Sequence, residues 1–370
     1  MDMLSKTSKN PESDDNLVNL LVAPDRAEVL KELSLHLSSI TLNDHQLCDI
    51  ELLATGAFSP LDGFLNRPDY EAVLDRLQLQ DGTVWPLPIC LSVSEKQGAQ
   101  LEGGQSVAIR DPEGFLLAIL HIEEIWPIEK DREALAVFKT SDKLHPRIHY
   151  LYENEGHFYV GGKLEVLSLP LHYDFKQLRL TPREVRHIYR KLAWKRTVGF
   201  QTRHPIHRPQ FEMTLKAMQE AKANLLILPI VGLTMPDDFD YYTRVRCYQE
   251  ILRNYPPSTV IMSLLPLSAR MAGDREALMH AIIARNYGCT HFIVGHNHAN
   301  PGLDSTGQPF YDSEKTREVV FQHSKAVGIS ITTFDELVYL PYEDEFRTMD
   351  RVCTPFSTQS LVRNSSSYGR

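Results

Sequence analysis

Seven consecutive residues at positions 201–207, Q-T-R-H-P-I-H, concentrate hydrogen-bond donors and positive charge in one short segment. Pro209 follows, and proline is typical of the first turn of a helix. A helix start presents free backbone amides, and together with Arg203 and two histidines these donors suit a phosphate or another oxyanion. The alternative is a basic loop with solvated arginines, in which His207 only caps the helix.

A second segment of this kind spans residues 270–276, R-M-A-G-D-R-E, and also precedes an expected helix. Gly273 allows a turn that other residues avoid, and the helix start would again offer free amides. For a ligand to bind here, Arg270 and these amides must face the same crevice as the first segment. In the alternative interpretation, Asp274 is simply the N-cap of the helix.

A third segment, residues 294–302, reads V-G-H-N-H-A-N-P-G and can expose backbone amides to a ligand. Its two histidines, two positions apart, raise the question of a metal. No cysteines or carboxylates accompany them in a fixed pattern, so we expect no metal site here. We expect polar loop residues that position a substrate.

Each segment follows an apolar run that is typical of a buried strand. The expected strands are residues 197–201, 224–229, 260–264, 291–294 and 329–333. Helical spacing of apolar residues over 209–223 and 275–287 supplies crossover helices, and Gly288 supplies a helix stop. This alternation predicts a parallel sheet, in which ligands bind beyond the carboxyl ends of the strands.

The N-terminal half has a different pattern, with short β-type runs at 85–93, 106–109 and 115–122 separated by turn residues. The sequence therefore predicts a disordered lead over 1–15, a β-rich domain over 16–170 and an α/β domain over 171–340, with a linker near 167–180. A short, less regular segment, 341–370, completes the chain, and we expect its end to be mobile.

Composition excludes several classes of function. The net charge of −9 disfavours nucleic-acid binding as the main function. The five cysteines are far apart and odd in number, which argues against a disulfide framework. Neither a signal peptide nor an apolar run long enough to span a membrane is visible. We expect a cytoplasmic protein without a nucleic-acid or membrane partner.

The ordered segments resemble those of the ATP sulfurylase (sulfate adenylyltransferase) family. In the first half, GAFSPLDGF at 56–64, DKLHP at 142–146 and YVGG at 159–162 are similar to family segments. In the second half, the segment at 201–207, VGLT at 231–234, RMAG at 270–273 and HFIVG at 291–295 occur in family order. The resemblance implies a β-rich PUA-like domain followed by a Rossmann-like nucleotidyltransferase domain, and a homo-oligomer.

The resemblance also implies the transfer of an adenylyl group from ATP to sulfate, with Mg²⁺ bound to ATP. Arg203, His204 and His207 would be catalytic, and Gln201, Arg203 and the amide of Ala299 would hold sulfate. ATP would be bound by eight residues: His207, Gln210, Arg270, Met271, Gly273, Gly295, His296 and His298.

This chain departs from the family pattern within its loops. His204 stands where the family usually has Asn, Gln210 where it has His, His296 where it has Arg, and Met235 where it has Lys. Residues 357–363 resemble the family's SGTxxR segment. Imidazole is largely neutral near pH 7, so His296 lacks the permanent charge of an arginine. Two alternatives therefore stay open. The acceptor is a different oxyanion or an organic molecule, or the chain binds a nucleotide with little turnover.

Overall fold

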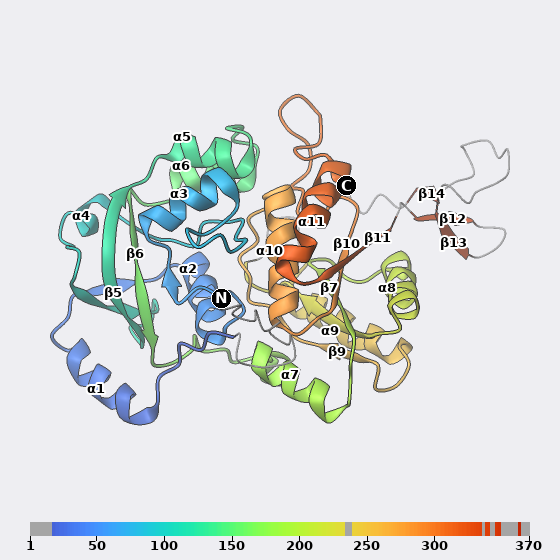
Figure 1. Ribbon diagram of the computed structural model, residues 1–370, viewed down its shortest axis with the longest axis horizontal. Coiled ribbons are helices and arrows are strands. Elements are labelled where there is room, and N and C mark those ends of the chain that lie inside the picture. The colour runs from blue at the N-terminus through green and yellow to red at the C-terminus, as the bar shows by residue number, and fades with distance from the viewer. Residues whose placement is uncertain (1–16, 234–238, 335–336, 341–344, 349–361, 364–370) are drawn as a thin grey trace, which may run out of the picture.

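The computed structural model describes residues 17–233, 239–334, 337–340, 345–348 and 362–363, and these residues form two main lobes (Figure 1). The expectations for residues 1–15, for Met235 and for most of 341–370 lie outside the described residues.

The N-terminal lobe is built around a mixed sheet. Its strands are β1 (Ser39–Thr41), β2 (Gly63–Phe64), β3 (Leu91–Val93), β4 (Ser106–Arg110), β5 (Leu116–Pro127) and β6 (Phe158–Val166). They run in the order β1-β4-β5-β6-β2, with β3 also paired to β6, and only the β1–β4 pairing among these is parallel. The helices are α1 (Pro24–Ser34), α2 (Asp44–Thr55), α3 (Arg67–Arg76), α4 (Glu95–Gly98), α5 (Lys130–Glu133) and α6 (Pro146–Glu153), and a π-helix (Ala134–Phe138) follows α5.

Two features of this lobe differ from the prediction. The expected strand at 85–93 is confined to Leu91–Val93, because Pro86 and Pro88 have no amide hydrogen for a strand ladder. Strand β6 was not predicted, since its Gly161 and Gly162 weaken the strand pattern. A Cβ on Gly162 would lie 2.0 Å from the carbonyl oxygen of His121. Glycine is needed here because neighbouring backbone comes too close for a side chain.

The second lobe contains a parallel sheet of five strands: β7 (Thr197–Thr202), β8 (Asn224–Pro229), β9 (Val260–Met262), β10 (His291–Val294) and β11 (Ser330–Thr333). Their order is β11-β10-β7-β8-β9, and every pairing is parallel. The predicted strands are confirmed. The strand order reverses between β7 and β10, which makes the carboxyl ends of these two strands the expected ligand crevice.

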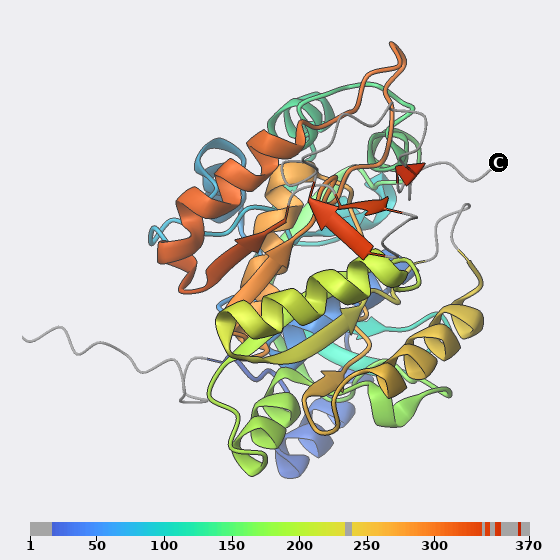
Figure 2. The same ribbon diagram turned by 90° about the vertical axis from the view of Figure 1, so that its right-hand side faces the viewer.

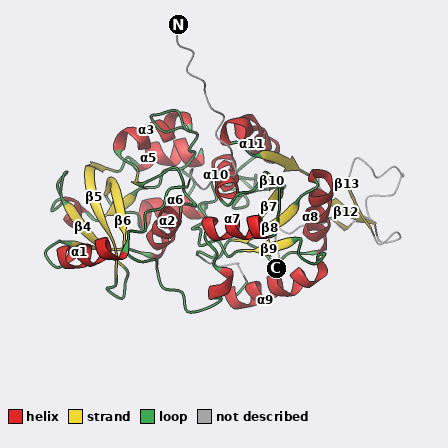
Figure 3. Ribbon diagram, turned by 60° about the horizontal axis from the view of Figure 1, so that its bottom comes forward, coloured by secondary structure: helices red, strands yellow, loops and turns green. Residues whose placement is uncertain are grey.

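Helices of the second lobe cover both faces of this sheet. They are α7 (Pro182–Lys191), α8 (Arg208–Ala221), α9 (Tyr241–Ile251), α10 (Gly273–Asn286) and α11 (Ser313–Val327). Figure 2 shows α11 beside α10, and in Figure 3 these two helices lie on the opposite side of the strands from α9. Successive residues of β8 point to opposite faces of the sheet. Ile227 packs with α8 and α9, whereas Leu226 and Leu228 belong to the hydrophobic cluster that contains α10.

Helix α10 lies between the two lobes (Figure 1). One hydrophobic cluster runs from the N-terminal lobe through α10 to the sheet. A polar residue of α10 also contacts the N-terminal lobe, since the Arg275 guanidinium donates to the carbonyls of Val73 (2.8 Å) and Leu74 (2.7 Å). These contacts fix the lobes relative to each other at the start of α10.

A small antiparallel sheet ends the described chain, with strands β12 (Leu337–Leu340), β13 (Glu345–Thr348) and β14 (Val362–Arg363) in the order β13-β12-β14. Among the described residues, no helix is long and apolar enough to cross a membrane.

Candidate functional site

The first predicted loop leaves the carboxyl end of β7. Gln201 is buried near the end of this strand, and its Nε2 donates to the carbonyl of His280 at 3.3 Å. Its Oε1 is also buried and has no hydrogen-bond partner among the described residues. The half-buried Arg203 extends toward the second loop, where its Nη1 lies 3.8 Å from the Met271 sulfur. Gln201 and Arg203 therefore lie against α10 and the second loop that leads into it.

His207 is the N-cap of α8, as the alternative interpretation expected. Its backbone amide donates to Oε1 of Gln210 at 3.0 Å, so the Gln210 side chain has a structural task at the helix start. The side chains of His204 and His207 are both exposed. This position gives them access to a ligand in solution.

Side chains of helix α9 bind the backbone carbonyls of the first loop. Arg244 and Tyr248 lie one turn apart on this helix and are both fully buried. Arg244 donates from Nη1 to the carbonyl of Arg203 at 2.8 Å, and the Tyr248 hydroxyl donates to the carbonyl of His204 at 2.9 Å. Successive carbonyls of the loop are thus fixed by one face of one helix.

The second loop leads into α10 and has an unusual backbone. Met271 has a φ of +57° and Gly273 a φ of +55°, in the left-handed region. A Cβ on Gly273 would lie 2.4 Å from the Tyr311 ring, so glycine is required there on two grounds. The alternative interpretation, in which Asp274 is only the N-cap, was wrong, since the N-cap is Ala272 and Asp274 lies in the first turn of α10. Its carboxylate pairs with Lys139 Nζ at 2.6 Å, because the N-terminal lobe brings that lysine to the helix start.

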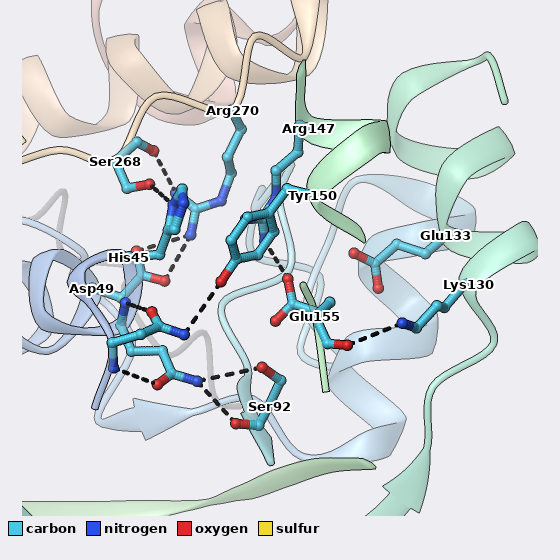
Figure 4. Close-up of polar contacts among 12 residues, drawn as sticks. His45, Asp49, Ser92, Lys130, Glu133, Arg147, Tyr150, Glu155, Ser268 and Arg270 are labelled. Atoms are coloured by element: carbon cyan, nitrogen blue, oxygen red, sulfur yellow. Dashed lines mark hydrogen bonds and ion pairs between the residues drawn. The ribbon is translucent and has the colours of Figure 1, made fainter. Parts of the chain in front are cut away.

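The Arg270 guanidinium is directed into the N-terminal lobe (Figure 4). Its Nη2 lies 2.8 and 2.7 Å from the two carboxylate oxygens of Asp49 on α2, and its Nη1 donates to the carbonyl of Ser268. Both charged side chains are 8% exposed. The side chain of Arg270 therefore fastens the loop to the other lobe.

A cavity beside this ion pair is lined by charged side chains that have partners of their own (Figure 4). Arg147 pairs with Glu155 at 2.8 Å. Glu133, whose pKa is raised by burial, accepts hydrogen bonds from the hydroxyls of Tyr70 and Tyr159 at 2.9 Å. Each of these charged side chains has an ion-pair or hydrogen-bond partner within the protein, so we assign the cavity to the support of the lobe interface.

His145 is a second link from the N-terminal lobe to the loop. This fully buried side chain accepts the Arg147 amide hydrogen at Nδ1, so its proton lies on Nε2, which donates to the carbonyl of Met271 at 2.9 Å. Burial lowers the pKa of His145, which keeps the ring neutral. The carbonyl of the left-handed residue Met271 is thus held by a side chain from the other lobe.

The third predicted loop leaves the carboxyl end of β10 and reaches the second loop. The Gly273 amide donates to the carbonyl of Ala299 at 3.1 Å. His298 places its Nε2 2.8 Å from Nδ1 of His280, and burial together with the neighbouring His280 lowers the pKa of His298 to about 3. Its ring is therefore neutral and engaged with α10. His296 is exposed, and Gly295 is half-buried at the strand end.

The structure thus brings most of the predicted residues to one edge of the sheet. Gln201 and His298 both contact His280, Arg203 contacts Met271, and Gly273 contacts the loop of Ala299. Arg270 and Gln210 lie in the same region but have structural partners. Among the described residues, no group of three or more His, Cys, Asp or Glu side chains is placed to hold a metal ion.

Sequence reasoning missed the residues that hold these loops: Asp49, Arg244, Tyr248, Glu276 as an anchor, and His280. Their polar side chains are a weak signal, because a buried polar group needs a partner that a sequence does not identify.

Two family models match the chain, one described as a PUA-like domain over residues 9–169 and one described as ATP-sulfurylase over residues 176–367. Fold and site together define a class of protein, in which a Rossmann-like nucleotidyltransferase domain follows a β-rich PUA-like domain. The predicted fold class is confirmed; the boundaries at 170 and 340 stay predictions.

Proteins named sulfate adenylyltransferase are similar to most of this chain. The one from Mycosarcoma maydis is 44% identical over 350 residues, which cover 93% of this chain and 60% of that protein. The one from Saccharomyces cerevisiae is 45% identical over 313 residues, covering 85% and 61%. The chain belongs to the ATP-sulfurylase family, and it spans about 60% of the length of these relatives.

A solved structure described as a hexameric APS kinase from Thiobacillus denitrificans is also similar. The match has a TM-score of 0.72 at 33% sequence identity and covers 90% of this chain and 58% of that chain.

Proposed function

We propose that this chain transfers the adenylyl group of ATP to sulfate. A sulfate oxygen attacks the α-phosphorus, a new O–P bond forms, and the bond to the β-phosphate oxygen breaks, so that adenosine 5′-phosphosulfate and pyrophosphate are produced. The observation that carries this proposal is the meeting of three donor-rich loops at the switch point of the sheet, linked by the Arg203–Met271, Gln201–His280 and Gly273–Ala299 contacts.

The predicted residue roles assign the two anionic substrates, ATP and sulfate, to these loops. Gln201, Arg203 and the amide of Ala299 would bind sulfate, and Arg203, His204 and His207 would stabilise the charge that develops during transfer. The left-handed Met271 and the backbone from Arg270 to Gly273 would line the nucleotide. Gly295, His296 and His298 would face the phosphates from the third loop. Its contact with His280 leaves His298 able to use only its other ring nitrogen.

Mg²⁺ would enter with ATP. Mg²⁺ prefers oxygen ligands and usually keeps waters and substrate phosphates in its coordination shell. The described residues offer no cluster of carboxylates for it at the crevice. The phosphates of ATP would therefore coordinate the Mg²⁺ ion. His207 and the backbone amides at the start of α8 would contact the Mg²⁺–ATP complex.

A second acceptor is the alternative that specific residues favour. His296 is exposed and replaces the usual Arg of the family, so the crevice has one permanent charge fewer beside Arg203, and the exposed His204 replaces the usual Asn. Such a site would accept an oxyanion of different size or charge, or an organic acceptor, with the same chemistry at the α-phosphorus.

An acceptor panel tests the proposal. The protein is incubated with ATP, Mg²⁺ and inorganic pyrophosphatase, and phosphate release and adenylylated product are measured with sulfate, selenate, molybdate or no acceptor. We expect sulfate-dependent formation of adenosine 5′-phosphosulfate. Release with another acceptor but not with sulfate would support the alternative, and ATP binding without turnover on any acceptor would contradict both.

Two further properties belong to this proposal. We expect a homo-oligomer, in line with the hexameric description of the similar structure. We also expect a reducing, cytoplasmic compartment, because the described cysteines, Cys48, Cys90, Cys247 and Cys289, are all free thiols.

A further inference from the structure

Two residues one turn apart on α10 contact all three loops of the crevice, and their side chains bind the second and third loops. Both carboxylate oxygens of Glu276 bind the second loop, accepting from the amides of Arg270 at 2.8 Å and Ala272 at 2.9 Å. His280 contacts the other two loops, through its ring with His298 and through its carbonyl with Gln201. Glu276 and His280 are 2% and 3% exposed, so neither is placed to meet a ligand itself.

We propose that Glu276 and His280 are a pair of positioning residues whose side chains set the relative placement of the second and third loops and fix His298 in one tautomer. This inference rests on the proposed function for its effect on catalysis. Its structural part, the placement of His298 and of the second loop, does not depend on which acceptor is used.

The Glu276 end of the pair stabilises an unusual backbone. Met271 is a non-glycine residue with φ of +57°, and the residues on both sides of it are the two whose amides Glu276 binds. Such conformations persist only where the surroundings enforce them. Burial alone would raise the pKa of Glu276, but His280 and these two amides lower it to about 2, so the anchor is ionised at neutral pH.

The His280 end of the pair controls the third loop. Its Nε2 faces Glu276 Oε1 at 3.6 Å, and its Nδ1 lies 2.8 Å from His298 Nε2. Two ring nitrogens at this distance share one proton, with one as donor and the other as acceptor. The protonation of His280 Nδ1 therefore dictates that of His298 Nε2, and the remaining His298 nitrogen takes the opposite role. The same loop carries Asn297 and Ala299 at φ of +53°, which also need outside support.

Three substitutions separate the two ends. His280→Leu removes both ring contacts, whereas in His280→Asn the amide occupies the place of Nδ1 and can still bond His298. Glu276→Gln keeps one acceptor but loses one of the two amide bonds. His323→Leu is the matched control, because His323 is also a helix histidine, and the bond that its ring makes among the described residues lies within α11, to the carbonyl of Val319.

The readouts are imidazole ¹⁵N shifts of His298, ATP affinity by calorimetry, and kcat and KM for adenylyl transfer. We expect a single His298 tautomer in the wild type and in His280→Asn, and a mixture in His280→Leu. ATP affinity should fall about tenfold or more in His280→Leu and in Glu276→Gln, with cooperative unfolding retained. His280→Asn should recover most of the loss, and His323→Leu should match the wild type.

An unchanged His298 spectrum and ATP affinity in His280→Leu would overturn the positioning role, as would equal impairment of His280→Asn and His280→Leu. The two proposals can fail separately. If the wild type binds ATP without adenylylating sulfate but the variants shift His298 and weaken ATP binding, the pair stands and the proposed function fails. If the wild type turns over and the variants behave like it, the function stands and the pair fails.

Discussion

At Arg203, different elements hold the side chain and the backbone. The carbonyl is fixed by Arg244 from α9, and the guanidinium lies against Met271 of the second loop. A planar guanidinium can present two parallel donors to an oxyanion, which a lysine ammonium cannot. The identity of this residue should therefore matter for the anion more than its charge does.

We predict that Arg203→Lys lowers kcat/KM for sulfate by about 10²-fold, the typical effect of losing one transition-state donor. The unfolding midpoint should change little, because the side chain is only half-buried. Steady-state kinetics with sulfate and ATP varied separately checks this result. Arg253→Lys, in a surface pair with Glu250, is the control. A sulfate KM and kcat equal to those of the wild type would remove Arg203 from the site.

The residue scale also shows what the sequence could and could not predict. Arg203 and Gln201 were predicted because their donors follow a strand end. Arg270 was predicted on the same ground, but its guanidinium binds Asp49, which lies 221 positions earlier in the chain. A pairing over such a distance leaves no local pattern, so the direction of a side chain in a loop is not visible in the sequence.

At the scale of elements, α9 and α10 act as supports for the loops. Arg244 is fully buried, and its Nε and Nη2 have no hydrogen-bond partner among the described residues. Such a group is costly to bury, so it contributes little net stability. Its retention is explained by the carbonyl of Arg203 that it holds.

We predict that Arg244→Met impairs activity more than stability. The carbonyl of Arg203 loses its donor, and kcat/KM should fall about tenfold for each 1.4 kcal/mol by which the transition state is less well stabilised. The free energy of unfolding should change less, because removal of the poorly paired charge offsets the lost hydrogen bonds. Tyr248→Phe should lose about 1 kcal/mol of stability and part of the activity. Denaturant unfolding and kinetics on both variants test this. A large loss of stability with kinetics unchanged would contradict the assignment.

A pH dependence follows from Glu276 on α10. Its pKa is lowered from 4.5 to about 2 in the folded protein. An unfolded chain binds the proton more readily, so this carboxylate stabilises the fold above about pH 4.5 and the contribution is lost as the pH falls toward 2. We predict that the stability difference between wild type and Glu276→Gln is largest near pH 6 and shrinks steadily below pH 4.5. A difference that is constant between pH 6 and 3 would argue against this carboxylate as an ionised anchor.

Helix α10 also marks the limit of prediction at this scale. Its apolar face, with Leu278, Ala281 and Ile282, was predicted correctly, and so were its stop at Gly288 and the strands before and after it. The burial of its other face was not predictable. Arg275 and Asn286 look like surface residues in the sequence, yet both bind carbonyls of the N-terminal lobe.

At the scale of the whole molecule, the N-terminal lobe holds the second loop of the crevice in place. Asp49 binds Arg270, His145 binds the carbonyl of Met271, and Lys139 binds Asp274. The second loop belongs to the second lobe but is held as much by side chains of the N-terminal lobe. This explains why the two domains must act as one unit, which neither sequence pattern suggests alone.

We predict that Asp49→Asn costs about 3–5 kcal/mol, because it leaves the Arg270 guanidinium buried and without its counter-charge. ATP affinity should fall with it, since the loop loses its anchor. Asp49→Asn combined with Arg270→Met should recover much of the stability but not the ATP affinity. Chemical denaturation and calorimetry measure the two quantities. If the single change costs less than about 1 kcal/mol, the Asp49–Arg270 ion pair does not anchor the second loop to the N-terminal lobe.

If the two lobes together form an adenylyl-transfer site for sulfate, as we propose, the protein must also catalyse the reverse reaction. The protein is mixed with adenosine 5′-phosphosulfate, pyrophosphate and Mg²⁺, and ATP is measured by light emission from luciferase. We predict ATP formation that requires both substrates and falls about 10²-fold in Arg203→Lys. No ATP from a folded protein that binds the nucleotide, or equal ATP formation by the Arg203→Lys variant, would contradict it.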